Sequence, residues 1–204
     1  MKTRRSKRSW MSYAVLLLCV VAKPAMAAEP AKAPQMSADE QKMMEAYAKA
    51  GTPGPEHMQM GKMVGTWDMD VTAYGGPTPE HDKGTAEFAS LLGGRVLTQT
   101  VHSTMMGQPY EGMGTQGYDN VSKKYWSIWM DSMSTGPLTS WGTCDAAGAC
   151  TYEGTSNDPI TGKAAKFHMT LKPDGADKQA FELSGPGPDG KQMKMMEIVY
   201  TRKK

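Results

Sequence analysis

The sequence predicts a mainly β domain, an antiparallel up-and-down β-barrel or a β-sandwich of about ten strands, preceded by a short α-helix. From Gly65 to the end of the 204-residue chain, apolar and polar residues alternate with period two, as they do in half-buried strands. Gly, Pro, Asn and Asp interrupt this alternation at short intervals, as expected for tight turns between antiparallel neighbours. The strands are expected near residues 65–74, 83–92, 95–105, 110–119, 124–133, 138–145, 150–156, 164–173, 178–184 and 193–202.

The first 27 residues have the three parts of a cleavable secretory signal peptide. Basic residues from Lys2 to Arg8 precede an apolar stretch of thirteen residues, and Ala25-Met26-Ala27 offers the small residues that the peptidase needs. Thirteen helical residues span roughly 20 Å, which is too short for a hydrocarbon core of roughly 30 Å. We therefore expect Sec-type export with cleavage after Ala27, a bacterial periplasmic or secreted protein, and no stable membrane span after cleavage.

Cleavage changes the charge of the protein. The segment carries six basic and no acidic residues, so the Lys and Arg count falls from 23 to 17 while all 21 Asp and Glu remain, a formal charge of −4. A mildly acidic protein lacks the basic surface that nucleic acids require. The 177 residues that follow residue 27 are enough for one domain. We divide them into a linker with a short helix, residues 28–54, and the β domain, residues 55–204.

The short helix is predicted from its caps and its amphipathic face. Ser37 begins a capping box, and Gly51 fits the position just after a helix end. Met43, Met44 and Tyr47 share one face, which we expect to pack on the β domain. The segment Thr-Pro-Gly-Pro-Glu then breaks the helix.

Two cysteines, Cys144 and Cys150, remain after cleavage. They end and begin two strand-like runs on either side of a turn-like segment, residues 145–148. A disulfide across this hairpin is possible if the two residues face each other, and an oxidising compartment favours it. The alternative is a pair of free thiols.

The entry to the first strand, Gly65-Thr66-Trp67, resembles the Gly-x-Trp signature of lipocalins and other calycins. In that family the Trp closes one end of a barrel and packs against a basic residue from a late strand. The resemblance implies that Trp67 closes the barrel and that Arg202 stacks on it. It favours a barrel over a sandwich, and closure also removes exposed strand edges.

Further short motifs are spread over residues 54–204: Gly54-Pro55-Glu56-His57, Leu92-Gly93-Gly94-Arg95, Glu111-Gly112-x-Gly114, Gly117-Tyr118-Asp119-Asn120, Trp129-x-Asp131-Ser132 and Tyr200-Thr201-Arg202. Together they resemble one bacterial family, the domain of unknown function numbered fifteen seventy-nine, which is similar to calycins. The resemblance implies a lipocalin-like barrel and carries no established reaction or ligand.

Period-two alternation predicts which side chains face the interior of each strand. Near residues 124–133 both faces are amphipathic, and the family-like motif favours the face that carries Trp129 as the inner one. The inward sets are Trp67, Met69, Val71 and Ala73; Tyr125, Ser127, Trp129 and Asp131; Ala165, Phe167, Met169 and Leu171; and Met196, Ile198, Tyr200 and Arg202.

The function predicted from these faces is the binding of a small, apolar molecule inside the barrel. The proposed ligand-binding residues are Tyr118, Trp129, Asp131 and Tyr200. An inward Asp131 would need a partner, for which Arg202 and a tyrosine hydroxyl are the candidates. The alternative is that these side chains fill a packed core without a cavity.

Two other functions stay open. The chain lacks Gly-x-Ser-x-Gly, His-Glu-x-x-His, Cys-x-x-Cys and glycine-rich phosphate loops, so no catalytic or metal-binding residue is assigned and no cofactor is expected. An isomerase or cyclase could still use Tyr, Asp and His of the lumen. Sixteen of the 19 methionines follow residue 27, and the segment from His57 to Met63 could hold copper, although methionine also serves as adaptable core filler.

Overall fold

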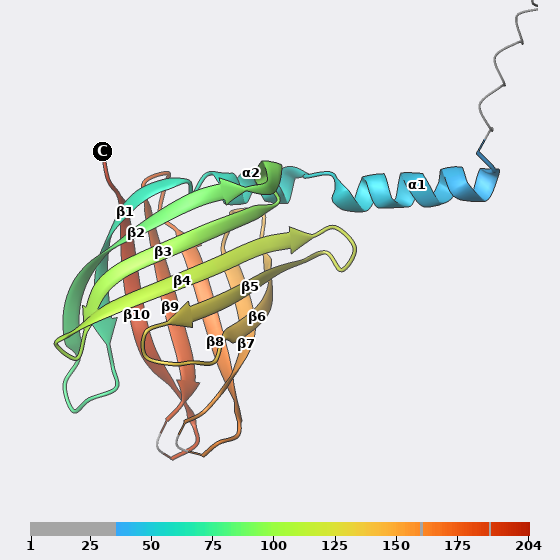
Figure 1. Cartoon of the computed structure of the whole chain (residues 1–204). Helices are drawn as coiled ribbons and strands as arrows, with labels where there is room; N and C mark the ends of the chain where they lie inside the picture. Colours follow the sequence, from blue (N-terminus) through green and yellow to red (C-terminus); the bar gives the residue numbers. More distant parts are fainter. Residues whose placement is uncertain (1–35, 160, 188) are drawn as a thin grey trace, which may run out of the picture. The chain divides into compact units, whose positions relative to one another are not determined.

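The computed structural model describes residues 36–159, 161–187 and 189–204. The predicted signal peptide, residues 1–27, and the linker up to residue 35 lie outside the described residues. Residues Ala38–Lys204 form one compact unit of two helices and ten strands (Figure 1). The elements are α1 (Ala38–Gly51), α2 (Pro55–Gly61), β1 (Gly65–Ala73), β2 (Glu80–Leu91), a 3₁₀ turn (Leu92–Gly94), β3 (Val96–Met105), β4 (Gln108–Asp119), β5 (Lys124–Asp131), β6 (Leu138–Cys144), β7 (Cys150–Asn157), β8 (Ala164–Pro173), β9 (Lys178–Pro186) and β10 (Gln192–Arg202).

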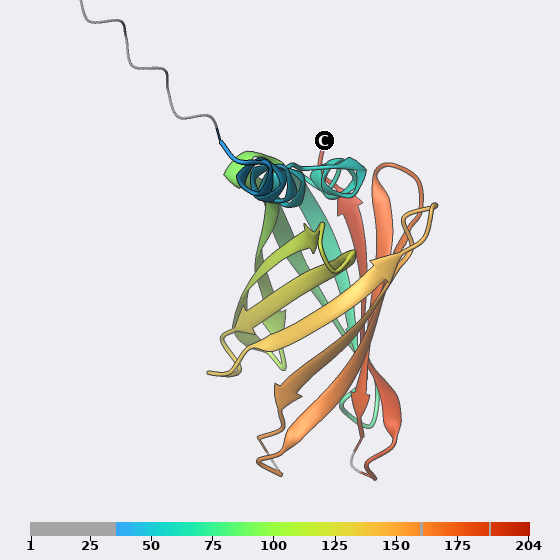
Figure 2. The same cartoon turned by 90° about the vertical axis from the view of Figure 1, so that its right-hand side faces the viewer.

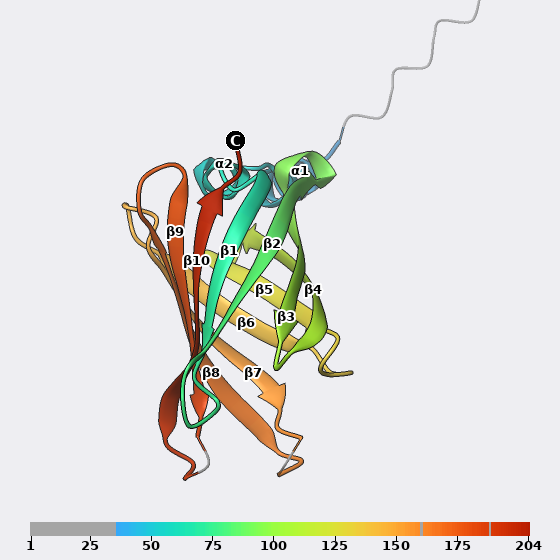
Figure 3. The ribbon, with the colours of Figure 1, turned by 90° about the vertical axis from the view of Figure 1, so that its left-hand side faces the viewer.

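The ten strands close into a barrel of up-and-down topology (Figures 2 and 3). Every strand pairs antiparallel with its neighbours in the chain, and β10 pairs with β1 to complete the circle. The predicted antiparallel barrel of about ten strands is therefore confirmed, and the sandwich alternative is excluded. Closure leaves none of these ten strands with an unpaired edge.

The predicted helix is present as α1, but it does not pack on the barrel as expected. No residue of α1 is buried, and Met43, Met44 and Tyr47 are all exposed. Its C-terminal end is bonded to the barrel, where the Asn120 amide donates to the Ala50 carbonyl at 3.0 Å. The amphipathic pattern predicted the helix correctly and its burial wrongly.

The helix that packs on the barrel is α2, which begins in the proline-containing segment that was predicted to break the first helix. Pro55 opens it, and proline suits the first turn of a helix because its fixed φ is already helical. The Gly54 N–H donates to His57 Nδ1 at 3.0 Å, and His57 and Met60 are buried. In Figure 2, α2 lies over the end of the barrel at which β1 begins and β10 ends.

The interior of the barrel holds the hydrophobic core. On β1 the alternation is as predicted, with Trp67, Met69 and Val71 buried between exposed Asp68 and Asp70. Within the described residues, no helix has the length and apolarity needed to cross a membrane. The buried core cluster draws its members from α2, β1 to β5 and β10, and includes Ala86, Phe88, Leu97, Val101, Ile198 and Tyr200.

Candidate ligand-binding cavity

Trp67 is buried near the end of the barrel at which β1 begins. Its side chain is 2% exposed, and its indole N–H donates to the Met63 carbonyl at 2.8 Å. The Arg202 guanidinium lies over the indole, 4.1 Å from the ring centroid, because Trp67 and Arg202 face each other in the β1–β10 register. Arg202 also donates to the Val64 carbonyl at 2.9 Å and pairs with Asp177 at 3.1 Å. The two residues thus tie β10 to the turn that connects α2 with β1.

Gly65 is required by the close approach of Arg202 to this turn. Its φ of +124° lies in a region that side chains other than glycine rarely adopt. A Cβ at this position would also lie 3.1 Å from Arg202 Nη1. The glycine of the Gly-x-Trp motif therefore has a local steric reason in this chain.

The lumen of the barrel contains a cavity of about 220 Å³. Met60 and Met63 from the α2 region contribute to its wall beneath the helix. A dry, apolar cavity of roughly 150 Å³ is known to hold benzene, so this volume suffices for a somewhat larger molecule. Most of the lining is aliphatic or aromatic, including Met69, Val71, Phe88, Leu97, Val101 and Ile198.

The Trp129 indole packs against two glycines of the neighbouring strand, β4. In the β4–β5 register Gly114 faces Trp129 and Gly112 faces Asp131. A Cβ at Gly112 would lie 2.2 Å from Trp129 Cζ2, and one at Gly114 would lie 3.0 Å from Cε3. The ring can therefore lie flat against β4 only because both positions lack side chains.

A small polar cluster fixes Trp129 from the other side. Asp131 Oδ2 accepts hydrogen bonds from the Trp129 indole at 2.9 Å and from the Tyr110 hydroxyl at 3.2 Å, and Oδ1 accepts from the Met133 N–H at 2.9 Å. The partner of Asp131 is thus a tyrosine hydroxyl, one of the two candidates, and not Arg202. Burial raises the pKa of Tyr110, and the negative charge of Asp131 raises it further, so this tyrosine stays a proton donor.

A second polar group lies around Tyr200, which is buried in the lumen wall. Its hydroxyl oxygen accepts from Gln99 Nε2 at 3.2 Å, and burial raises its pKa to about 12. Gln179 faces Tyr200 in the β9–β10 register and also lines the cavity. Gln99, Gln179 and Tyr110 were not among the predicted site residues, although alternation places Gln179 on the same face as Phe181 and Leu183.

Tyr118 does not line this cavity. Its ring meets His57 of α2 edge to face at a centroid distance of 5.8 Å and Tyr125 at 4.9 Å. It borders a second hollow, of about 720 Å³, which also contacts the end of α1 and the outward Trp126. Among the four predicted ligand-binding residues, Trp129 and Tyr200 line the cavity, Asp131 holds Trp129, and Tyr118 supports α2.

The histidines and the methionines of residues 57–63 are not grouped around one site. His57 is buried under α2, and none of the four histidines lines the cavity. Met58 is exposed, whereas Met60 is buried, so neighbouring thioethers of this segment point in different directions. Among the described residues, no three His, Cys, Asp or Glu side chains are grouped as metal ligands would be.

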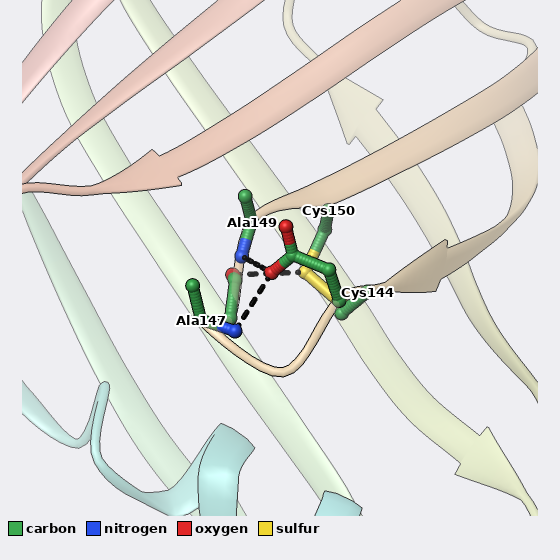
Figure 4. Close-up of a disulfide and its surroundings, with 6 residues drawn as sticks. Cys144, Ala147, Ala149 and Cys150 are labelled. Carbon is green, nitrogen blue, oxygen red and sulfur yellow. Dashed lines mark hydrogen bonds between the residues drawn. A yellow bond between two sulfur atoms is a disulfide. The ribbon is translucent and has the colours of Figure 1, made fainter.

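Cys144 and Cys150 form a disulfide across the β6–β7 hairpin (Figure 4). The turn between them is held by Asp145, whose carboxylate accepts from the N–H groups of Ala147 at 2.9 Å and Ala149 at 3.0 Å. Both cysteines belong to the cavity wall, together with Gly148 at the tip of the turn and Gln59 of α2. The disulfide therefore fixes a hairpin at the cavity rim next to the helix.

We expect reduction of this disulfide to lower the thermal stability of the protein. The closed loop is short, so the loss in unfolding free energy is about 2 kcal/mol, which corresponds to a fall in Tm of roughly 4–8 °C for a domain of this size. Calorimetry with and without reductant measures the shift, and Cys144→Ala/Cys150→Ala serves as a control that reductant leaves unchanged. Free alkylation of both thiols in the native protein, or an equal effect of reductant on the control, would contradict the prediction.

Comparison with known proteins gives a family and a fold. The model of the family described as "Protein of unknown function (DUF1579)" matches residues 52–202. No curated protein matches the chain. The crystal structure of Rv2717c from M. tuberculosis is similar with a TM-score of 0.59 and 16% identity, covering 75% of this chain and 100% of that one. The S-type phycobiliprotein lyase CPES from Guillardia theta has a TM-score of 0.55 and 9% identity, with 76% and 96% coverage. At these identities the likeness shows a shared barrel fold.

Proposed function

The chain belongs to the DUF1579 family, and on that premise we propose that it is an exported protein that binds one small, mostly apolar molecule inside its barrel. The observation that carries this proposal is the cavity of about 220 Å³, which has apolar walls and a few fixed polar groups. Binding sites for small molecules have this composition, because apolar surface supplies affinity and a few hydrogen-bonding groups set orientation.

The arrangement of the site supports binding rather than filling by side chains. Trp129 lies flat against β4 and its indole N–H donates to the Asp131 carboxylate and to the Tyr110 hydroxyl, so the ring cannot collapse into the lumen without breaking both hydrogen bonds. Trp67 and α2 cover one end, so water is kept from the apolar wall there. A rigid wall of this kind keeps the cavity available to a ligand at low cost in conformational entropy.

Export is supported by two independent features. The n-region, the short apolar stretch and Ala25-Met26-Ala27 form a secretory signal pattern, and the Cys144–Cys150 disulfide suits an oxidising compartment. We place the protein in the bacterial periplasm or outside the cell, where a barrel of this kind would carry or sequester its ligand.

Native mass spectrometry of the protein purified from its own cells tests both parts of the proposal. We expect the mass of a chain that begins at Ala28, together with an additional mass that is released when the protein is denatured. An apolar fluorescent dye should bind the ligand-free protein and be displaced by the released molecule. A chain that retains Met1 would refute export, and a protein that carries no adduct and excludes every such dye would refute binding.

A further inference from the structure

The cavity wall is electrically neutral. Among the described residues, no Asp, Glu, Lys, Arg or His side chain lines the cavity. Asp131, which lies beside it, already accepts hydrogen bonds on both carboxylate oxygens. Burying a charge without a partner costs several kcal/mol, because the charge loses its hydration and gains nothing in return. An ionised ligand would therefore find no counter-ion here.

One polar group of the wall lacks a partner. Gln179 is 4% exposed, and its amide nitrogen is the one buried side-chain N or O atom without a hydrogen bond among the described residues. Leaving such a donor unpaired costs about 1–3 kcal/mol, so native proteins rarely do so without reason. The terminal bond of glutamine turns readily, which lets the NH₂ group face the lumen.

The residue paired with Gln179 on the neighbouring strand supplies a second donor. Tyr200 is the register partner of Gln179 on β10, and such opposed residues have their Cβ atoms about 4.5–5.5 Å apart. The Tyr200 oxygen accepts from Gln99, while the Tyr200 proton has no acceptor among the described residues. The high pKa of Tyr200 keeps this proton in place. The lumen wall thus carries two donors on paired residues of β9 and β10, and no charge.

We infer that the ligand is an uncharged, mostly apolar molecule with a carbonyl-type oxygen, which accepts hydrogen bonds from Gln179 and Tyr200. This inference rests on the proposed binding function and adds the chemical class of the ligand. Ketones, aldehydes, esters and quinones of about two fused rings in size fit the description. Free carboxylic acids in their ionised form and quaternary amines do not fit it.

Three naphthalenes of equal shape test the inference: acetylnaphthalene, ethylnaphthalene and naphthoate, each substituted at the same ring position. Titration calorimetry gives the Kd of each for the wild type, Gln179→Met and the matched control Gln116→Met, which also changes a lumen glutamine. The ratio of the hydrocarbon Kd to the ketone Kd should fall in Gln179→Met and stay unchanged in Gln116→Met. The expected fall is roughly 2- to 13-fold, the value of one net hydrogen bond. Naphthoate should bind at least about tenfold more weakly than the ketone.

Other outcomes separate this inference from the proposed function. If ethylnaphthalene binds and the ketone ratio is the same in Gln179→Met, or if naphthoate binds as tightly as the ketone, the inference is overturned while apolar binding stands. A water molecule alone would then satisfy Gln179. If no naphthalene binds while an apolar dye does, the inference falls and the proposed binding stands; if the protein excludes the dyes as well and carries no adduct, both fall. Should Gln179→Met not fold, Tyr200→Phe and the wild-type comparison of ketone with naphthoate decide the question.

Discussion

Replacing Trp67 by alanine should lower the free energy of unfolding by about 3–5 kcal/mol, the cost of removing a fully buried aromatic side chain. The indole is 2% exposed, packs edge to face on Phe88 and donates to the Met63 carbonyl at 2.8 Å. Its loss would leave that carbonyl without its donor and open the barrel beneath α2. Because small domains have about 5–15 kcal/mol of stability in total, this one change removes a large part of it. Urea denaturation followed by circular dichroism measures the loss.

A matched control and a double-mutant cycle identify the cause of this loss. Trp141→Ala removes the same side chain from the outer face, where it is 50% exposed, and should cost less than about 1 kcal/mol. The cycle with Arg202→Met should give a coupling energy of about 0.5–2 kcal/mol between Trp67 and Arg202, because the guanidinium lies over the ring at 4.1 Å. Equal losses in Trp67→Ala and Trp141→Ala would show that Trp67 does not close the barrel.

The fold could be predicted from the sequence because its signals are local. Alternation on β1 separates Trp67, Met69 and Val71 from the exposed aspartates, and each turn carries its own Gly, Pro or Asn. The second helix was missed because Pro55 signals both a break and a helix start, and only packing of Met60 on the core decides between them. Burial of α1 was wrongly expected because an amphipathic face indicates a helix and does not say what covers it.

The site was harder to predict from the sequence than the fold, because it depends on pairs of residues that are distant in sequence. Tyr110 and Asp131 meet only because β4 and β5 pair in one register, and an inward tyrosine hydroxyl was foreseen without its identity. On β5 both faces are amphipathic, since Trp126 and Ile128 lie on the outer face, so alternation alone could not choose the inner face. Gln179 was overlooked because a polar residue in a strand is usually solvated.

Replacing Gly112 by alanine should destabilise the protein by roughly 2–4 kcal/mol and weaken binding of an apolar dye. The added methyl group would lie 2.2 Å from Trp129 Cζ2, so the indole must leave its place on β4. Forcing atoms into a packed wall costs about 1–3 kcal/mol, and Asp131 loses a hydrogen bond worth about 1 kcal/mol or more. Alanine meets no backbone strain here, since φ at Gly112 is not positive. The displaced ring would enter the cavity and compete with the ligand.

Removing the indole first should relieve most of this cost. In a Trp129→Leu background the methyl group has no ring to meet, so Gly112→Ala should cost less than about 1 kcal/mol there, and the two changes should be strongly coupled. Gly136→Ala is the matched control, because a Cβ at Gly136 would meet only Ser134 Oγ at 3.9 Å. Chemical unfolding of the four proteins of the cycle and of the control supplies the energies, and tryptophan fluorescence reports the ring position. If Gly112→Ala costs the same with and without Trp129, then the missing side chain at Gly112 is not what allows the indole to lie against β4.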